Sequence, residues 1–336
     1  MKRFWTQIFL FFLLGLVPII GVYLFFQAEG IQPLLTDSIS FDAKAELLAE
    51  QPKEDISILA LGSSITLNNI GSKTLDEYLG EDYSYYNAAS WGLTMSDLRL
   101  MLLPLLKKYN PDLILLASGP MDFEQAKISI CSEVEFDQFI NAAPNGYFFA
   151  KNTDIFSIIQ RRKRTLELTE FASFRDRKHL LFDEWGGINL VTDKENFELE
   201  RYNKSLIKVT DEEQYQELEK ILELIKEHKT KLIFIASPMK KSPNCDDPIC
   251  QEFISNHHKK VRALVESKDQ IFFNLHKIHN YPDSLFCDES HLIHKGPEQF
   301  SQDLIKHVPL LELLREKKEN ELTHTDNPIT SHVSSL

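Results

Sequence analysis

Short apolar runs, each separated from the next by a helical pattern, recur along the central part of the chain. They are residues 56–61, 83–90, 112–118, 231–237 and 270–276. Four of the five are nearly continuously apolar, which is typical of parallel strands covered on both faces. Strand and helix in alternation predict an α/β fold, a three-layer sandwich around a central parallel sheet of about five strands.

Two of the intervening helices have clear boundaries. In residues 94–109, Thr94 precedes Asp97 by three positions, a spacing that resembles a capping box, and apolar positions follow at helical spacing. Residues 210–229 open with acidic side chains and end with basic ones, which complements the helix dipole. Ligands of such folds bind where strands end and loops begin.

The N-terminal segment carries the most specific compositional signal. Residues 4–26 contain no charged side chain, and a helix of that length would reach roughly 34 Å, enough to cross a bilayer core of about 30 Å. Lys2 and Arg3 precede it, so the positive-inside rule predicts a cytoplasmic N-terminus and an extracytoplasmic remainder. A cleaved signal peptide is an open alternative, although its apolar region is usually shorter and no A-x-A-like site follows. The third interpretation of this segment is a buried helix of a soluble protein.

The remaining composition predicts the domain organisation. A lid is expected within the globular part because residues 124–210 follow the third strand and contain no clear strand; a separate small domain is the alternative. Residues 316–336 lose apolar periodicity, as a disordered tail does. The expected order is a cytoplasmic stub 1–3, a transmembrane helix 4–26, a stalk 27–53, a globular domain 54–315 with its lid 124–210, and the tail.

Charge and cysteine content narrow the class of protein. The net charge of −13 argues against a nucleic-acid partner, and 43% hydrophobic residues allow a substantial core. Four cysteines outside the cytoplasm are expected to pair, and Cys245–Cys250 with Cys131–Cys287 is the preferred pairing among three. A zinc site is the alternative to disulfide pairing, but no second C-x-x-C or H-x-x-H motif stands at a recognisable spacing to complete the set of ligands.

The loops at the strand ends contain the groups that serine-based acyl transfer requires. Ser64 follows the first strand, while Asp288 and His291 follow the last. Their i, i+3 spacing places the carboxylate and the imidazole on one face of a turn, where the carboxylate can orient the ring and the ring can take the serine proton. The Ser64 and Gly92 backbone N–H groups are the predicted oxyanion donors.

Other residues at these ends are weaker candidates. Asn87, Gly119 and Asp122 are candidates for substrate binding, although Asp122 fits better as a structural carboxylate that accepts from backbone N–H groups. Ser63 and His294 are poorer alternatives for the nucleophile and the base.

Metal and cofactor chemistry is not expected. His276, His279 and His294 are interpreted as scattered loop residues rather than as a metal cluster, and the proposed chemistry needs no cofactor.

In the lid, the basic run at 161–164 is either a solvated helix face or a contact for anionic lipid or polymer. Trp185, Phe148 and Phe149 are core residues or the lining of an acyl pocket.

Taken together, the motifs resemble those of the SGNH (GDSL-type) hydrolases, whose fold is flavodoxin-like. The G-S-S at 62–64 matches the first block with Ser64 as nucleophile, residues 87–92 match the second, and the D-x-x-H at 288–291 matches the last. The resemblance spans about 55–310 without the lid. It implies a Ser64–His291–Asp288 triad and an oxyanion hole that includes Gly92.

Two positions depart from the family pattern. Ser63 replaces the usual aspartate, and Met121 stands where the third block has an asparagine, so one oxyanion donor is missing. The strings G-S-S and D-E-S-H-L-I-H-K-G are closer to membrane-anchored O-acyltransfer proteins of cell-envelope polymers, of the D-alanyl-transfer and alginate-acetylation types.

The sequence therefore predicts a membrane-anchored serine esterase or O-acyltransferase that acts on an acylated envelope glycan or lipid, with envelope-polymer acyltransfer proteins as partners. A catalytically inactive module that binds an envelope polymer is the alternative, and Met121 is its best support.

Overall fold

A computed structural model describes most of the globular part of the chain. The described residues are 2–28, 35–36, 38–125, 131–141, 182–190, 210–240, 248–278 and 281–325. They divide into two compact units, Met1–Glu50 with Gln138–Leu181 and Gln51–Asp137 with Phe182–Leu336.

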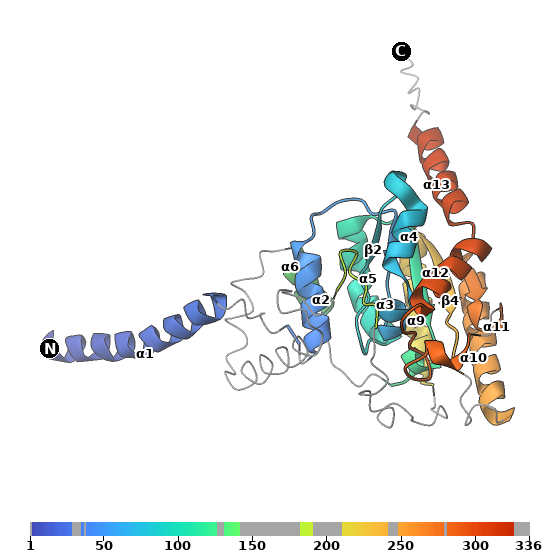
Figure 1. Cartoon of the computed structure of the whole chain (residues 1–336). Coiled ribbons are helices and arrows are strands. Elements are labelled where there is room, and N and C mark those ends of the chain that lie inside the picture. Colours follow the sequence, from blue (N-terminus) through green and yellow to red (C-terminus); the bar gives the residue numbers. More distant parts are fainter. Residues whose placement is uncertain are drawn as a thin grey trace, which may run out of the picture. The chain divides into compact units, whose positions relative to one another are not determined.

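The larger unit is built on a five-stranded sheet (Figure 1). All four strand pairings are parallel, and the spatial order is β2-β1-β3-β4-β5. The strands are β1 (Ile58–Ala60), β2 (Tyr85–Asn87), β3 (Leu113–Ser118), β4 (Lys231–Ala236) and β5 (Ile271–Asn274). Each lies inside one of the five predicted runs, so the predicted parallel sheet is confirmed.

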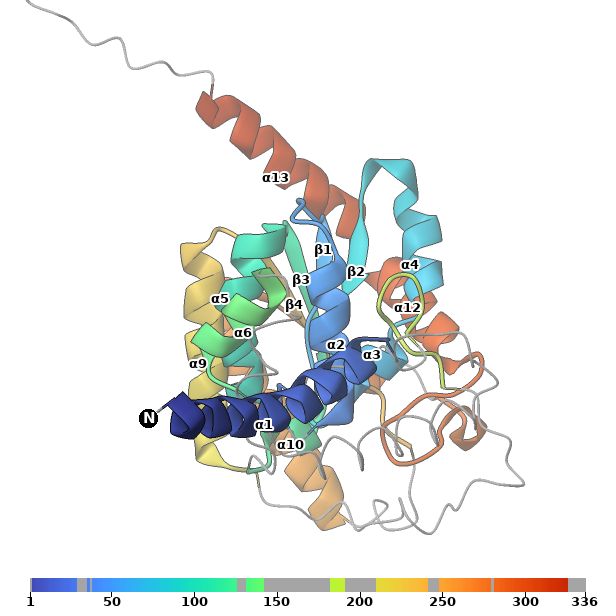
Figure 2. The ribbon, with the colours of Figure 1, turned by 90° about the vertical axis from the view of Figure 1, so that its left-hand side faces the viewer.

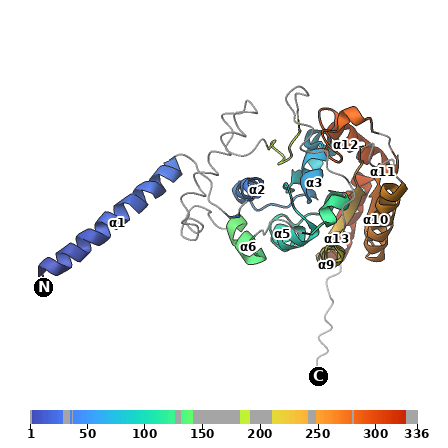
Figure 3. The same cartoon turned by 90° about the horizontal axis from the view of Figure 1, so that it is seen from below.

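Helices cover both faces of this sheet (Figure 2 and Figure 3). One face carries α5 (Met95–Tyr109), α9 (Glu212–Glu227) and α10 (Pro248–Ser267). The other carries α3 (Ser64–Asn69), α4 (Ser72–Leu79) and α12 (Gly296–His307). The three-layer α/β arrangement expected of an SGNH-type fold is therefore present. Shorter elements are η1 (Gly80–Asp82), η2 (Pro120–Phe123), α6 (Glu133–Asn141), α11 (Leu275–Ile278) and η4 (Asp283–Leu285).

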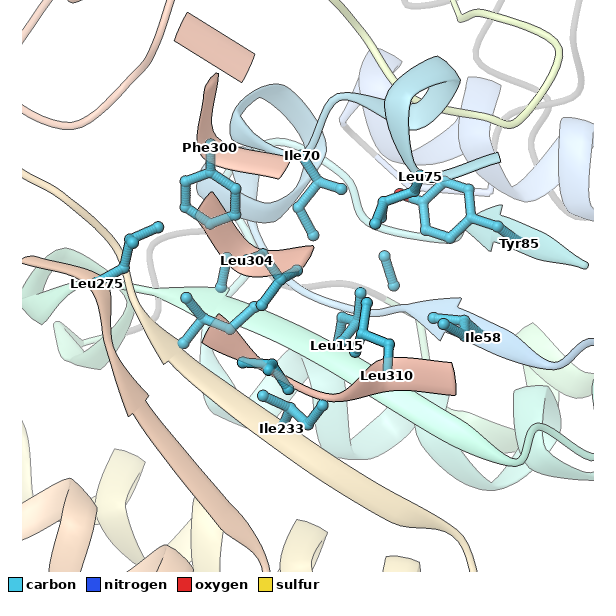
Figure 4. Packing of buried hydrophobic residues seen from close by; sticks show 14 of the residues in the cluster. Ile58, Ile70, Leu75, Tyr85, Leu115, Ile233, Leu275, Phe300, Leu304 and Leu310 are labelled. Atoms are coloured by element: carbon cyan, nitrogen blue, oxygen red, sulfur yellow. The ribbon is translucent and has the colours of Figure 1, made fainter. Parts of the chain in front are cut away.

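The core between the sheet and the α4–α12 layer is formed by aliphatic and aromatic side chains. Figure 4 shows Ile58, Leu115 and Ile233 of the sheet facing Leu304 and Leu310. All five are fully buried. Burial of a leucine or isoleucine side chain contributes about 1.5–3 kcal/mol, so this layer accounts for a large share of the stability.

The two helices with predicted boundaries begin close to the expected positions. Thr94 caps α5, and the Asp97 carboxylate accepts from its backbone N–H at 2.8 Å, which forms the predicted capping box. The side chain of Asp211 caps α9 by accepting from the Glu213 N–H at 3.0 Å. These caps satisfy donors that would otherwise be left without partners.

The predicted disordered tail begins too early. α13 (Leu310–Thr325) continues ten residues past the predicted boundary at 315, and 326–336 lie outside the described residues. Beyond residue 315, charged side chains hold this helix: Lys317 pairs with Asp112 at 2.9 Å, and the Lys318 ammonium lies 4.3 Å from the centre of the Tyr83 ring. Loss of apolar periodicity was therefore a poor guide, because these contacts are polar.

The smaller unit contains two complete described helices, α1 (Lys2–Ala28) and α2 (Ile39–Glu50), together with the end of α6. We expected residues 4–26 to span a membrane as a helix. The segment is helical, with Pro18 inside it, but none of the described helices combines the length and the hydropathy that a membrane span requires. The expected span is thus not supported. α2 lies in the predicted stalk, where Phe41 and Leu48 are fully buried.

Much of the predicted lid cannot be compared with the structure. Residues 142–181 and 191–209 lie outside the described ones, and with them Phe148, Phe149 and the basic run 161–164.

The predicted cysteine pairs fare differently. Cys287 is a buried free thiol whose Sγ lies 3.6 Å from the His291 carbonyl oxygen, so the expected Cys131–Cys287 disulfide is not formed. The Cys245–Cys250 pair stays a prediction because Cys245 is not among the described residues.

Candidate active site

The turn between β1 and α3 presents one hydroxyl. Within residues 61–70, Ser64 alone is not buried. Ser63 caps α3 by accepting from the Ile65 N–H at 3.2 Å, which leaves Ser64 as the first helical residue. A Cβ at Gly62 would lie 1.9 Å from Thr66 Oγ1, so the tight approach of turn and helix requires glycine there.

The segment before α12 brings a base to this hydroxyl. His291 Nε2 lies 2.7 Å from Ser64 Oγ, although 227 residues separate them in the chain. On the other side of the ring, Nδ1 lies 2.6 Å from Asp288 Oδ2. The structure thus brings together the three residues predicted from the sequence to form a triad.

Asp288 fixes both the charge and the orientation of this arrangement. Burial by itself raises the pKa of its carboxyl, but hydrogen bonds from the His291 side chain and from the Ser290 and His291 backbone N–H groups outweigh burial and lower the pKa. The ionised carboxylate accepts a hydrogen bond from Nδ1–H of His291, which leaves Nε2 as the acceptor for the serine hydroxyl. Ser64 therefore faces a general base in the tautomer that proton removal requires.

The predicted oxyanion donors lie at the same end of the sheet. Ser64 occupies the first turn of α3, where backbone N–H groups have no intrahelical acceptor. Gly92 has φ of 75°, a left-handed conformation that favours glycine. Its loop is tied to the nucleophile turn because Ser90 N donates to the Gly62 carbonyl at 3.2 Å. The placement is compatible with two backbone donors.

Asp122 follows β3, and its side chain is hydrogen-bonded to Ser63, the residue before the nucleophile. It is buried, and its Oδ2 accepts from Ser118 Oγ at 2.8 Å and from Gly119 N at 3.3 Å. Burial raises its pKa to about 6, against the lowering effects of hydrogen bonds from Ser63, Ser118 and Gly119 and of the nearby His291 charge. These contacts fit the structural interpretation of Asp122 rather than substrate binding.

Asn87 and Met121 are also placed. Asn87 is fully buried, and its Oδ1 accepts from Ala89 N at 3.0 Å, so its amide organises the loop after β2 instead of facing a substrate. Met121 is partly exposed in η2, and its thioether carries no hydrogen-bond donor. The donor expected from the family pattern is absent at that position.

Three residues here have the spacing of a metal site. One ligand atom each from Cys287, Asp288 and His291 lie within 4.8 Å of one another. Burial raises the pKa of the Cys287 thiol to about 12, while the thiolate is the form that binds metals. Both ring nitrogens of His291 already have partners in Asp288 and Ser64, so this cluster fits a proton relay better than a cation.

The other residues considered for metal do not gather at the triad. His276 lies in α11 with its ring 5.5 Å from that of His258, the His294 backbone N–H donates to Leu190, and His279 lies outside the described residues.

A cavity of about 420 Å³ borders the end of α3 that lies away from Ser64. Its lining includes Lys73, Glu77, Asp183 and Trp185. Trp185 also packs against the core cluster, which agrees with the core interpretation of this side chain. None of the triad residues lines the cavity, and the hydrogen-bonded triad therefore locates the reactive centre.

Two neighbouring asparagines of α3 have functional placements that the sequence did not reveal. Asn68 Oδ1 accepts from Trp91 Nε1 at 2.9 Å, next to Gly92, and Asn69 contacts both flanks of His291. The only local signal was a pair of polar residues near the end of a short helix. Nothing in it indicated the distant segment that they bind.

Among known proteins, only solved structures were found to resemble this chain. No family model matches the chain, and no curated protein matches its sequence. The structure is similar to a solved structure of TesA (13% identity, 77% of this chain and 99% of that chain, TM-score 0.40). It is also similar to a lipase/acylhydrolase from Enterococcus faecalis (14%, 79% and 97%, 0.40) and to Axe2, an acetyl-xylooligosaccharide esterase from Geobacillus (12%, 76% and 95%, 0.37). Likeness of this degree does not establish a shared activity.

Proposed function

We propose that this protein is a serine esterase or O-acyltransferase that acts on an acylated cell-envelope glycan or lipid. The observation that carries the proposal is the continuous hydrogen-bonded line from Ser64 through His291 to Asp288, with lengths of 2.7 and 2.6 Å. A serine hydroxyl, an oriented imidazole and an ionised carboxylate in this order are the requirements for nucleophilic acyl transfer.

In the first half-reaction, Ser64 Oγ attacks the carbonyl carbon of an ester while its proton moves to His291 Nε2. The carbonyl oxygen becomes an oxyanion, and in this proposal the Ser64 and Gly92 backbone N–H groups bind it. The tetrahedral intermediate collapses when His291 returns the proton to the alkoxy oxygen. An alcohol leaves, and the acyl group stays on Ser64.

In the second half-reaction, a hydroxyl group resolves the acyl-enzyme. His291 removes its proton as it attacks the acyl carbon, and then protonates Ser64 Oγ when the serine leaves. If the hydroxyl belongs to water, the reaction is hydrolysis; if it belongs to a sugar, the reaction is transfer.

Two features support a glycan and transfer to it. The G-S-S and D-x-x-H-L-x-x-K-G strings resemble the envelope O-acyltransfer branch. The cavity beside α3 combines the Trp185 ring with the carboxylates of Glu77 and Asp183, and carboxylates accept hydrogen bonds from sugar hydroxyls.

A fluorophosphonate probe tests the proposal directly. The wild-type protein should be labelled, with the adduct mapped by mass spectrometry to Ser64, while Ser64→Ala and His291→Ala should lose labelling. Ser267→Ala is a matched control, because Ser267 ends α10 far along the chain and bonds only locally to the Leu264 carbonyl. A folded wild-type protein that stays unlabelled would contradict the proposal.

Hydrolysis and transfer are separated by following the acyl group. An acetylated donor is supplied with and without a glycan acceptor, and free acetate and acetylated glycan are both measured. Acetate release without transfer to any acceptor would leave an esterase and reject the transferase.

Met121 favours the alternative of an inactive module that binds an envelope polymer. Loss of one oxyanion donor commonly costs about 10²–10³ in rate. Such a module would bind acylated glycan in a pull-down or by calorimetry, with Ser64→Ala binding as well as the wild type and neither protein labelled.

Cellular location and partners stay predictions. An extracytoplasmic domain attached to the membrane is proposed from the sequence alone, where Lys2 and Arg3 precede an uncharged segment. Fractionation of cells followed by carbonate extraction would test attachment, and recovery of the intact protein in the soluble fraction would reject it. Co-purification from membranes would identify envelope acyltransfer proteins as partners.

A further inference from the structure

α3 carries the nucleophile at its first residue and a fully buried amide at its last. Asn69 is 0% exposed and binds the segment that contains His291. Its Nδ2 donates to the Ser290 carbonyl at 2.8 Å, and its Oδ1 accepts from the Leu292 N–H at 2.8 Å. Nδ2 also donates to Ser237 Oγ at 3.0 Å. Asn69 thus holds the backbone on both sides of the base.

A primary amide suits this position for a chemical reason. It offers two N–H donors and a carbonyl acceptor in one plane, as a neighbouring strand would, and all are used here. Aspartate would place an acceptor against the Ser290 carbonyl, and alanine would leave buried backbone groups without partners, which is costly.

The His291 segment is fixed from two directions. From within the segment, Asp288 Oδ1 accepts from the Ser290 and His291 N–H groups at 2.9 and 2.8 Å. From α3, Asn69 binds the residues immediately before and after His291. Without the second set of bonds, the loop would keep its internal turn but lose its register against the helix that carries Ser64.

α3 in turn has a fixed place on the sheet. Thr66 Oγ1 donates to the Ala117 carbonyl of β3 at 2.7 Å and accepts from the Ala117 N–H at 3.0 Å. The six-residue helix therefore gives Ser64 and Asn69 one common frame.

We infer that Asn69 is a positioning residue that sets the distance between Ser64 Oγ and His291 Nε2 and thereby determines the rate of acylation. The inference rests on the proposed function. A misplacement of about 1 Å between reacting groups can cost about 10²-fold in rate. The bond between nucleophile and base joins segments more than 200 residues apart, and Asn69 is the side chain that links them.

The test compares the rate of fluorophosphonate acylation at Ser64 with the free energy of unfolding measured in urea. Asn69→Ala should remain folded and be acylated about 100-fold more slowly. Asn69→Asp, which keeps the volume, should also be slow. Because the base is displaced, the acylation rate should fall while the KM for an ester substrate stays within about threefold.

Asn274→Ala is the matched control. Asn274 is also buried, and its Oδ1 accepts from Lys277 N at the start of α11, at the opposite edge of the sheet from β2. It should lose stability while acylation stays within about threefold of the wild type.

The outcomes separate this inference from the function on which it rests. Acylation of folded Asn69→Ala at close to the wild-type rate overturns the inference alone. So does unfolding of both Asn69 variants, which would assign the residue a purely structural role. A wild-type protein that is not acylated at all overturns the proposed function and the positioning role together.

Discussion

Two adjacent buried histidines on α10 should make the stability of the protein fall in mild acid. His257 and His258 are only 3% and 5% exposed. Burial lowers the pKa of His257 to about 3, with help from the charges of His258 and Lys260. Burial likewise lowers the pKa of His258 to about 4, with smaller effects from His276 and nearby cations.

The sign and size of the effect follow from proton linkage. Between pH 6.5 and 4 both histidines become protonated in the unfolded chain but stay neutral in the folded one. Their contribution to stability is therefore fully present above pH 6.5 and is lost as the pH falls. A pH of 5 lies about 1.5 units below the ordinary histidine pKa of 6.5, so keeping each of these histidines neutral in the folded state costs about 2 kcal/mol at that pH. The pair therefore removes about 4 kcal/mol between pH 8 and pH 5.

Asp122 acts in the opposite direction. Its pKa, raised by burial from 3.8 to about 6, means that the folded form binds the extra proton between these values. Relative to pH 8, it contributes about 1 kcal/mol in favour of folding at pH 5. The expected net loss between pH 8 and pH 5 is about 3 kcal/mol, a large fraction of the 5–15 kcal/mol typical of a domain.

Urea denaturation at pH 8 and pH 5 measures this difference. Neither ring nitrogen of His258 has a hydrogen-bond partner, so His258→Leu should fold at pH 8 without a large loss and should remove about half of the histidine contribution. His228→Gln, at an exposed position, is the control and should keep the full pH dependence. Equal stability at both pH values, or an unchanged slope in His258→Leu, would refute the reasoning.

Three further predictions concern the site. Gly92→Ala keeps the backbone N–H but forces a side chain into a left-handed conformation, which should cost about 1–2 kcal/mol in urea denaturation and slow acylation about 10²-fold by displacing that donor; an unchanged rate would show that the site does not require glycine at this position. Met121→Asn supplies a donor and should raise the acylation rate up to about 10²-fold, whereas an unchanged or lower rate would show that the position does not face the oxyanion. Thr66→Val breaks both bonds to Ala117 and should lower the free energy of unfolding by about 1–3 kcal/mol, and a loss below the experimental error would contradict the role of Thr66 in holding α3.

The sequence allowed the sheet and the meeting of Ser64 with His291 to be predicted for one physical reason. Parallel strands are buried on both faces, so their apolar runs are visible locally, and their carboxyl ends all lie at one edge. Residues in the loops that follow the first and last strands therefore come together without any knowledge of intermediate contacts.

Other features depend on partners that no local pattern encodes. α13 is held partly by ion pairing between Lys317 and Asp112, which lie 205 positions apart, and Asn69 is defined by bonds to a segment more than 200 residues away. The pairing of Cys287 was predicted from compartment and number alone, and its thiol instead lies against the His291 carbonyl. Patterns within one element cannot reveal such contacts.

The strand order has a consequence for where the reactive serine can stand. From β1 the chain crosses to β2 through α3 and α4 on one face, and it then returns past β1 to β3 through α5 on the other. Connections that leave in opposite directions open a crevice at the carboxyl end of β1, a topological switch point. The placement of Ser64 at this point is thus a product of the strand order, and shortening the surrounding loops would leave the switch point where it is.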